Sequence, residues 1–344
     1  MTCPICRLGA APDCGVCGFR ARQLEDGLFE SGADVTKVEY PRTGNDEMAA
    51  VEETSYWFAH RNSIIAAAVT LYPWQAPLLD IGGGNGFQAR LLSSLGEGVV
   101  MVEPGAAGCV NAITRSVSPV VRATLESLHL KDGSVGGIAL FDVLEHLAPR
   151  GALLGEASRI IRRGGRLYIT VPSLRWLWSY EDVRAEHKLR YTAASLREEL
   201  TKQGYEIEYL TYFFLPLVPP IFALRSLPTL LGFHGTDHAT GREHSADGFL
   251  GRALRSHLRL EVGWLPGERR AAVGVITAVC CPEAIAAIAT AGGTNHMLQL
   301  HLCRPDQRFA SGVYSSSCWT LESSLAPTCS PSCFALIFGW IQSI

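Results

Sequence analysis

The sequence predicts an α/β fold built around a parallel sheet, and three observations support this prediction. Residues 78–86 (LLDIGGGNG) place an apolar run before a glycine-rich turn, and the helix-compatible residues 87–95 follow. Residues 98–103 (GVVMVE) form a second apolar run that ends in an acid, and residues 167–171 form a third run after a glycine pair. Apolar runs that alternate with helical segments are typical of parallel strands buried on both faces.

The composition sets limits on size, partners and location. The chain has 344 residues, of which 47% are hydrophobic, so it has room for one α/β domain with additions. Its net charge of −3 gives no overall attraction to nucleic acid. The N-terminus lacks the basic, apolar and small-residue pattern of a signal peptide. We therefore expect a cytoplasmic protein, and the charge disfavours nucleic acid as its partner.

The longest apolar run, residues 213–233, does not suit a membrane-spanning helix. It contains four prolines and Arg225, which argue against a helix in lipid. We interpret it as the start of an apolar cap over the sheet, covering residues 213–270. A peripheral contact with a membrane is the alternative for this run.

Residues 1–20 contain two C-x-x-C pairs, which favour a small zinc-binding segment of the zinc-ribbon type. Four thiolates fill the tetrahedral shell of a structural zinc and leave no open position. The two pairs would supply them from Cys3, Cys6, Cys14 and Cys17. Gly18 suits the tight turn after the second pair, whereas Arg7 stands at the equivalent place after the first. Unrelated reduced thiols and a redox pair are the alternatives. Metal spacing favours a reducing setting over a disulfide framework.

A polar, glycine-dotted stretch over residues 21–51 is predicted to be a linker. The following residues, 52–65 (EETSYWFAHRNSII), place their apolar side chains at helical spacing. We interpret the aromatic residues as the core of a docking helix. The alternative is that Tyr56 and Arg61 face a cofactor or substrate.

The glycine-rich turn after residue 81 is the strongest sign of a ligand. Gly82, Gly84 and Gly86 allow a left-handed backbone and the close approach of a ligand, because they lack a Cβ atom. A dinucleotide fingerprint, G-x-G-x-x-G, would need a third glycine at the position of Phe87. The acid Asp80 instead precedes three alternating glycines and suits a ligand with an ammonium group. A turn without any ligand is a further possibility.

This D-x-G-x-G-x-G pattern resembles motif I of the class I S-adenosylmethionine-dependent methyltransferases. Glu103, 21 residues beyond Gly82, ends the next apolar run, where a carboxylate can accept hydrogen bonds from both ribose hydroxyls. Residues 52–65 resemble the W-F-x-x-R helix of a bacterial group, of the type 11 and type 12 kind, that methylates small molecules and glycans. The resemblance implies that S-adenosylmethionine is the cofactor.

The resemblance continues over residues 123–147 and implies further contacts to the cofactor. Backbone amides of Thr124 and Leu125 would contact adenine, although Ala123 stands where an acid is usual and Glu126 could substitute for it. A second pair, Phe141 and Asp142, would border the methionine end.

Two histidines are candidate catalytic residues. His146, expected with Glu145 at the start of a helix, is either a general base for a hydroxyl or amine acceptor or a residue that fixes its loop by hydrogen bonds. His187 lies in residues 176–192, which resemble the family's D…H-x-x-R-Y-(S/T) segment together with Asp182 and Arg190. These three residues either bind or deprotonate the acceptor, or anchor a lid.

The family implies a Rossmann-like sheet of seven strands with helices on both faces. We expect this domain over residues 52–281, with the last strand, residues 271–280, inserted antiparallel. Residues 234–244, with three histidines, are expected to be a solvated loop. Residues 282–344 are an extension to which the sequence assigns neither a fold nor a role.

The predicted function is methyl transfer from S-adenosylmethionine to a small-molecule or glycan acceptor. Two alternatives stay open. Some RNA methyltransferases also carry an N-terminal four-ligand zinc module, which makes RNA an alternative acceptor. The altered adenine positions also permit an inactive module that binds cofactor or a partner without turnover.

Overall fold

The computed structural model describes residues 2–25, 27–31, 48–49, 51–232, 258 and 260–262, together with the backbone of residues 275–282. The predicted histidine loop and residues 283–344 lie outside this part of the chain. No helix in the described part has the length and the apolarity that a membrane span requires.

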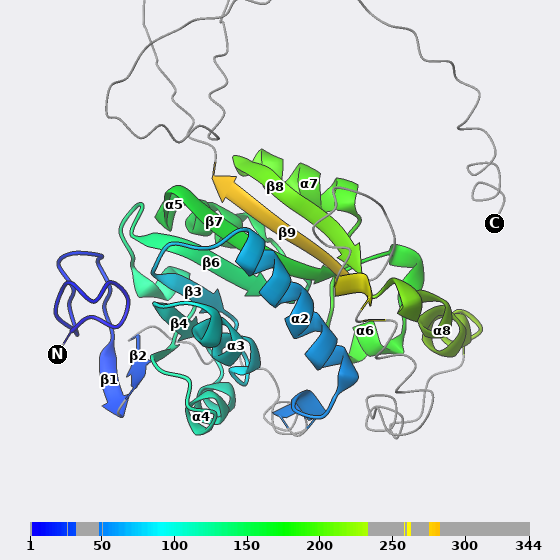
Figure 1. Cartoon of the computed structure of the whole chain (residues 1–344), viewed down its shortest axis with the longest axis horizontal. Coiled ribbons are helices and arrows are strands. Elements are labelled where there is room, and N and C mark those ends of the chain that lie inside the picture. Colours follow the sequence, from blue (N-terminus) through cyan, green and yellow to red (C-terminus); the bar gives the residue numbers. More distant parts are fainter. Residues whose placement is uncertain are drawn as a thin grey trace, which may run out of the picture. The chain divides into compact units, whose positions relative to one another are not determined.

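A single twisted sheet organises the described residues (Figure 1). Its strand order is β1-β2-β5-β4-β3-β6-β7-β9-β8. Strands β2 to β7 run parallel to one another. β1 pairs antiparallel with β2, and β9 pairs antiparallel with both β7 and β8. The predicted seven-stranded sheet with its antiparallel last strand is therefore confirmed. Its seven strands are β3 (Leu78–Ile81), β4 (Val99–Val102), β5 (Val120–Arg122), β6 (Val135–Phe141), β7 (Ile161–Pro172), β8 (Tyr205–Phe213) and β9 (Val275–Pro282).

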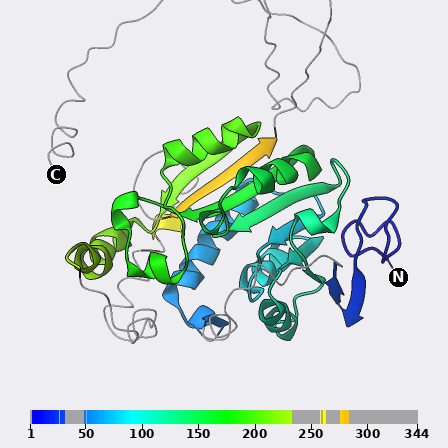
Figure 2. The same cartoon turned by 180° about the vertical axis from the view of Figure 1, so that it is seen from behind.

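Helices cover both faces of this sheet (Figures 1 and 2). One face carries α2, α3 and α4, and the other carries α5 and α7. Strands β3, β4 and β6 are buried along their whole length, as their unbroken apolar runs predict. The helices are α2 (Tyr56–Leu71), α3 (Phe87–Leu95), α4 (Ala106–Thr114), α5 (Gly151–Ile160), α6 (Tyr180–Arg184) and α7 (Ala193–Lys202).

Local sequence signals set the ends of these helices. Ser55 caps α2 by accepting a hydrogen bond from the Trp57 amide over 3.2 Å. Thr192 opens α7 with a capping box, and Gly204 follows that helix with a φ of 80°. Because α7 ends here, β8 begins within three residues of the end of the helix.

The predicted linker over residues 21–51 contains regular structure that the sequence did not reveal. β1 (Arg22–Glu25) and β2 (Leu28–Glu30) form an antiparallel pair around Gly27, and β2 adds to the sheet beside β5. β1 is mostly polar and β2 has only three residues, so neither shows the apolar pattern of a buried strand. The main compact unit, Met1–Ala287, accordingly includes the N-terminal residues.

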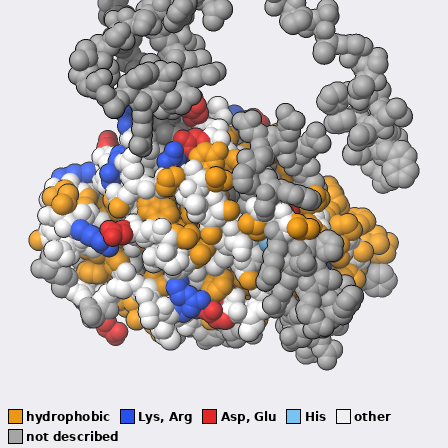
Figure 3. All heavy atoms as spheres, in the orientation of Figure 1, with side chains coloured by type: hydrophobic (Ala, Val, Ile, Leu, Met, Phe, Trp, Pro, Cys, Tyr) orange, Lys and Arg blue, Asp and Glu red, His pale blue; other side chains and the backbone are white. Residues whose placement is uncertain are grey.

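The first part of the predicted cap is helical. The chain after β8 forms η5 (Leu215–Leu217), α8 (Val218–Ile221), the π-helical turn η6 (Phe222–Ser226) and α9 (Leu227–Leu230). Ser226 binds the Leu177 carbonyl over 2.9 Å, which fastens these turns to the loop after β7. Figure 3 shows hydrophobic side chains gathered on this end of the described surface, and Leu224 and Leu230 are each 69% exposed.

Candidate functional site

The glycine-rich turn lies between the end of β3 and the start of α3. Gly82, Gly84 and Gly86 have φ values of 68°, 54° and 78°, which favour glycine strongly over other residues. A Cβ atom on Gly86 would lie 2.8 Å from the Cβ of Ala112, and one on Gly82 would lie 2.9 Å from Val143. A Cβ on Gly84 would meet nothing within 4 Å. Gly82 and Gly86 therefore allow the turn to pack closely against Val143 and Ala112, whereas Gly84 borders open space.

Asp80 is a buried acid with an oxygen that has no hydrogen-bond partner. Its side chain is on β3 and the residue is 1% exposed, and its Oδ2 has no partner in the described structure. Burial raises the pKa of Asp80 to about 7, although the positive charge of Arg61 opposes the shift. Because a buried carboxylate without a partner is costly, this oxygen is suited to an ammonium group of a ligand.

Glu103 lies just after β4, next to the same turn. One carboxylate oxygen accepts the Gly84 amide at 2.9 Å, and the other accepts the Gly105 amide at 2.7 Å. Burial raises the pKa of this carboxyl to about 7, against the effect of the two amides. Each oxygen keeps a second lone pair, so Glu103 can still accept hydrogen bonds from two hydroxyls.

The amide of Thr124, predicted to contact adenine, already has a hydrogen-bond partner. Its amide donates to the hydroxyl of Ser127 over 3.0 Å, and Ser127 also contacts Ser31 at 2.9 Å. Leu125 is buried in the core, and Glu126 is exposed at the start of η2 (Glu126–Leu128). An adenine that uses the Thr124 amide would have to displace Ser127.

Asp142, after β6, is held in an unusual conformation. It has a φ of 56°, and its oxygens contact the Thr170 hydroxyl at 2.7 Å and the Arg61 guanidinium at 3.0 Å. The preceding Phe141 belongs to the buried cluster beneath α2. Arg61 therefore points toward this end of the sheet, which favours the alternative in which it faces the site.

The two candidate catalytic histidines lie side by side. The ring centroids of His146 and His187 are 4.9 Å apart, at 74° to each other. The residues before α5 form the short turn η3 (Leu144–His146) and not the start of the helix as predicted, because Pro149 and Arg150 separate that turn from the helix. Burial and the neighbouring His187 lower the pKa of His146.

Asp182 organises the segment that carries His187. It accepts hydrogen bonds from His187 Nδ1 at 2.9 Å and from two Arg190 nitrogens at 2.8 and 2.9 Å. Although burial raises it, these hydrogen bonds hold the pKa of Asp182 below its usual range. The segment is thus built around one buried carboxylate that fixes the orientation of the imidazole.

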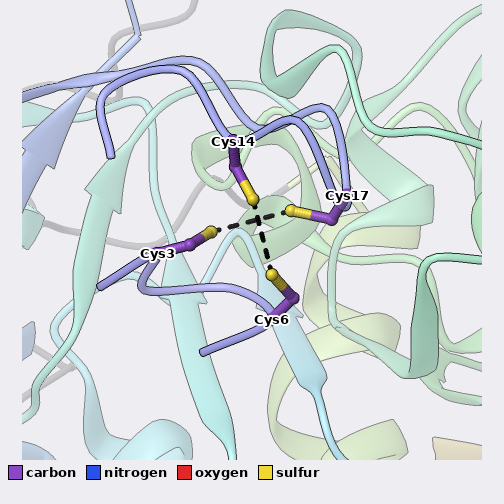
Figure 4. A group of neighbouring side chains, drawn as sticks. All are labelled: Cys3, Cys6, Cys14 and Cys17. Carbon is purple, nitrogen blue, oxygen red and sulfur yellow. Dashed lines mark hydrogen bonds between the residues drawn. The ribbon is translucent and has the colours of Figure 1, made fainter. Parts of the chain in front are cut away.

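The four N-terminal cysteines form a cluster in which the sulfurs point toward one another (Figure 4). The Sγ atoms of Cys3 and Cys17 are 3.6 Å apart, and those of Cys6 and Cys14 are 3.5 Å apart. Ligands about 2.3 Å from a tetrahedral zinc lie ~3.8 Å from each other, so the spacing fits this ion.

This cysteine cluster packs against the residues that follow the predicted adenine loop. The Lys131 amide donates to the Cys17 carbonyl over 2.8 Å. A Cβ atom on Gly18 would lie 2.7 Å from the carbonyl oxygen of His129. The cluster therefore shares a close backbone contact with residues 129–131.

A buried polar network beside the glycine turn escaped the sequence analysis. Glu52 pairs with Arg115 and accepts a hydrogen bond from Asn85 at 3.4 Å, while Arg115 also binds the Asn85 carbonyl at 2.9 Å. No motif marks these residues, because their partners are 30 or more positions away in the sequence.

Comparison with known proteins agrees with this geometry. A family model described as a methyltransferase domain matches residues 79–169, which run from β3 to β7. A protein of Mycolicibacterium smegmatis, named as a probable S-adenosylmethionine-dependent methyltransferase, is 26% identical over 171 residues, which are 49% of this chain and 66% of that protein. A protein of the same description from Mycobacterium tuberculosis is 26% identical over 132 residues, which are 38% of this chain and 48% of that protein. This chain thus spans between about half and two thirds of the length of these relatives.

Two methyltransferases are among the solved structures with a similar fold. Haemonchus contortus phosphoethanolamine N-methyltransferase 2, in complex with S-adenosyl-L-methionine, is 15% identical with a TM-score of 0.46, and the match covers 72% of this chain and 59% of that one. Geranyl diphosphate C-methyltransferase from Streptomyces coelicolor is 14% identical with a TM-score of 0.40, and the match covers 60% and 71%. The sequence matches, together with the strand order, show that the residues from β3 to β7 are similar to class I S-adenosylmethionine-dependent methyltransferases.

Proposed function

We propose that this protein binds S-adenosylmethionine at the carboxyl ends of β3 and β4. It would transfer the methyl group of this cofactor to a small-molecule or glycan acceptor. The unpaired Oδ2 of buried Asp80, beside a glycine turn that leaves open space at Gly84, is the observation that carries the proposal. When bound, the cofactor would supply a sulfonium methyl group for in-line attack by the acceptor, with S-adenosylhomocysteine as the leaving group. The rest of the work falls to residues of this chain.

Those residues bind and position. Asp80 would hold the ammonium of the cofactor, and Glu103 would accept hydrogen bonds from its ribose hydroxyls. The Arg61–Asp142 pair stiffens the loop after β6, which the family resemblance places near the methionine end. Holding the reactants in a near-attack geometry is the main contribution that a protein makes to such a displacement.

A small-molecule or glycan acceptor is favoured by the surroundings of the site. The turns from η5 to α9 add an apolar layer beside the loop after β7, and the chain carries a net charge of −3. An RNA acceptor would call for a basic surface. The exposed leucines of α9 and its neighbours also suit a peripheral contact with a membrane or a lipid-like acceptor.

Calorimetry with S-adenosylmethionine and S-adenosylhomocysteine tests the cofactor, with NAD as the competing ligand. We expect both sulfur compounds to bind and NAD not to bind. Asp80→Asn should weaken binding, whereas Asp132→Asn, which removes a mostly exposed acid paired with Arg159, should not. Uptake of NAD alone, or equal binding by both variants, would contradict the proposal. Release of S-adenosylhomocysteine with a panel of small hydroxyl and amine acceptors then tests turnover.

The cysteine cluster is proposed to hold one structural zinc, which fits a reducing cytoplasmic setting. The hydrogen bond from Cys17 lowers the pKa of Cys3, which favours a thiolate at that position. Metal analysis should find one zinc per chain, and Cys6→Ser should lower that content. A protein that purifies without zinc and keeps the same thermal stability when zinc is added would refute this assignment.

A further inference from the structure

A cluster of metal-binding side chains lies outside the cofactor contacts and the cysteine segment. One ligand atom from each of Glu145, His146 and His187 lies within 4.8 Å of the others. Glu145 and His146 come from η3, at the end of β6, and His187 comes from the loop after α6. Two imidazoles and a carboxylate are donors that suit a divalent first-row transition ion.

Glu145 is the residue of this cluster whose burial points most directly to a bound cation. It is 0% exposed, and neither of its carboxylate oxygens has a hydrogen-bond partner in the described structure. An ionised Glu145 is a buried charge without a counter-charge in contact, and a protonated Glu145 is a donor without an acceptor. A bound cation satisfies both oxygens and removes the problem in either case.

His187 is already oriented for this role. Its Nδ1 contacts the Asp182 carboxylate at 2.9 Å, which leaves Nε2 to bind a metal ion. A carboxylate behind a histidine is the usual arrangement around metal-binding imidazoles, since it fixes the tautomer and the direction of the ring. Asp182 is itself held by the bidentate Arg190 contact, so the orientation is rigid.

The backbone also brings the two parts of the cluster together. The amide of Lys188 donates to the carbonyl of Glu145 over 2.7 Å, which joins the His187 loop to η3. The His187 side chain is 18% exposed, so the cluster is open to solvent on one side. The nearby positive charge of Arg61 is balanced by its ion pair with Asp142.

We propose that Glu145, His146 and His187 form a second metal site, which binds a divalent first-row transition ion through two imidazole nitrogens and one carboxylate. Three protein ligands leave coordination positions open, as catalytic metal sites do. If the proposed methyl transfer is correct, the open positions face the acceptor and favour one with an oxygen donor, such as a hydroxyl or a carboxylate. The metal site itself does not depend on that function.

Manganese titration of the zinc-loaded protein tests the site, since thiolates select zinc and leave manganese to nitrogen and oxygen donors. We expect one Mn²⁺ per chain, with electron-spin-echo couplings from two histidine nitrogens. Glu145→Gln and His187→Ala should each weaken Mn²⁺ binding by about tenfold or more. His129→Asn is the matched control: it removes an exposed histidine at a φ of 53°, which Asn tolerates, and should change nothing.

Two controls keep the result interpretable. Each variant must retain its zinc content and its binding of S-adenosylhomocysteine, which separates a lost metal site from a lost fold. The nitrogen couplings of the unmodified protein provide a readout that needs no variant. Absence of Mn²⁺ binding at millimolar concentration, couplings without histidine nitrogen, or unchanged affinity in Glu145→Gln would overturn the proposal, whether or not the protein transfers methyl groups.

Discussion

Arg7 and Gly18 occupy equivalent positions one residue after each C-x-x-C pair, and both have a left-handed backbone. Their φ values are 57° and 87°, and their amides donate to the carbonyls of Cys3 and Cys14 over 3.0 and 2.8 Å. The two turns thus share one backbone geometry, although only Gly18 carries the residue that the geometry favours.

Substitutions at these two positions should change stability by unequal amounts. Arg7→Gly relieves the left-handed strain but loosens the unfolded chain, so we expect the free energy of unfolding to change by at most ~1 kcal/mol. Gly18→Ala should lower it by ~2 kcal/mol or more, because the added Cβ would press against the His129 carbonyl. Urea unfolding of the zinc-loaded protein measures both. Equal losses in the two variants would argue against the shared geometry.

The glycine turn offers a second matched pair. Gly84→Ala should cost about 1 kcal/mol of stability for its φ of 54°, and should weaken S-adenosylhomocysteine binding by about tenfold, because the methyl group enters the open space. Gly86→Ala should mainly destabilise the fold, since its Cβ would collide with Ala112. Calorimetry and thermal melting of both variants separate the two effects. A Gly84→Ala protein with full affinity would show that the ligand lies elsewhere.

Cofactor affinity should depend on pH through Asp80. Its folded pKa of about 7 lies above the ordinary value of 3.8, so an ammonium ligand that needs the ionised form binds more weakly as the pH falls below about 7. The loss is expected to approach about tenfold per pH unit if Asp80 alone titrates.

The same shift has a consequence for stability without ligand. Between pH 4 and pH 7 the folded protein holds a proton on Asp80 that the unfolded chain has lost. This carboxyl therefore contributes a loss of stability as the pH rises through that range, and Asp80→Asn should flatten this part of the pH profile. Unfolding measured at several pH values gives the profile. The same slope in both proteins would exclude Asp80 as its source.

Arg61 should tune this pH dependence. Its positive charge lowers the pKa of Asp80, so Arg61→Met should move the midpoint of cofactor binding to a higher pH. The variant also leaves Asp142 without its ion-pair partner, and we expect a loss of stability of ~3 kcal/mol. Calorimetry over a pH series, at a temperature where the variant is folded, measures the midpoint. A midpoint that stays or falls would disprove the electrostatic link between these residues.

Removal of zinc should weaken binding at the cofactor site. The cysteine segment binds the backbone at Lys131 and packs at His129, a few residues from the predicted adenine contacts at Thr124 and Leu125. Chelation should lower the melting temperature and weaken S-adenosylhomocysteine binding several-fold, because the loop loses its support. Restored zinc should reverse both changes. Loss of stability without any change in affinity would limit zinc to a role in the N-terminal segment.

The sequence revealed those parts of the fold that local chemistry specifies. The unbroken apolar runs of β3 and β4 and the glycines after residue 81 locate the strands and the turn, because burial and a positive φ each restrict the residues allowed. The acids Asp80 and Glu103 stand at the strand ends where the pattern predicted them.

The parts that the sequence concealed depend on distant partners. β2 has only three residues, and its pairing with β5 spans about 90 residues, so nothing local marks it. The Arg61–Asp142 ion pair follows from how α2 lies against the end of β6. The isolation of Glu145 is also a property of the packed structure, since burial cannot be seen in one residue type.

The position of β9 between β7 and β8 has a consequence for how the protein forms on the ribosome. Among the described strands, β8 pairs only with β9, and one edge of β7 also pairs with β9. The pairing of β7 and β8 with β9 therefore cannot be completed until residue 282 has left the exit tunnel of the ribosome. During that interval the unpaired edges of β7 and β8 stay exposed to other nascent chains.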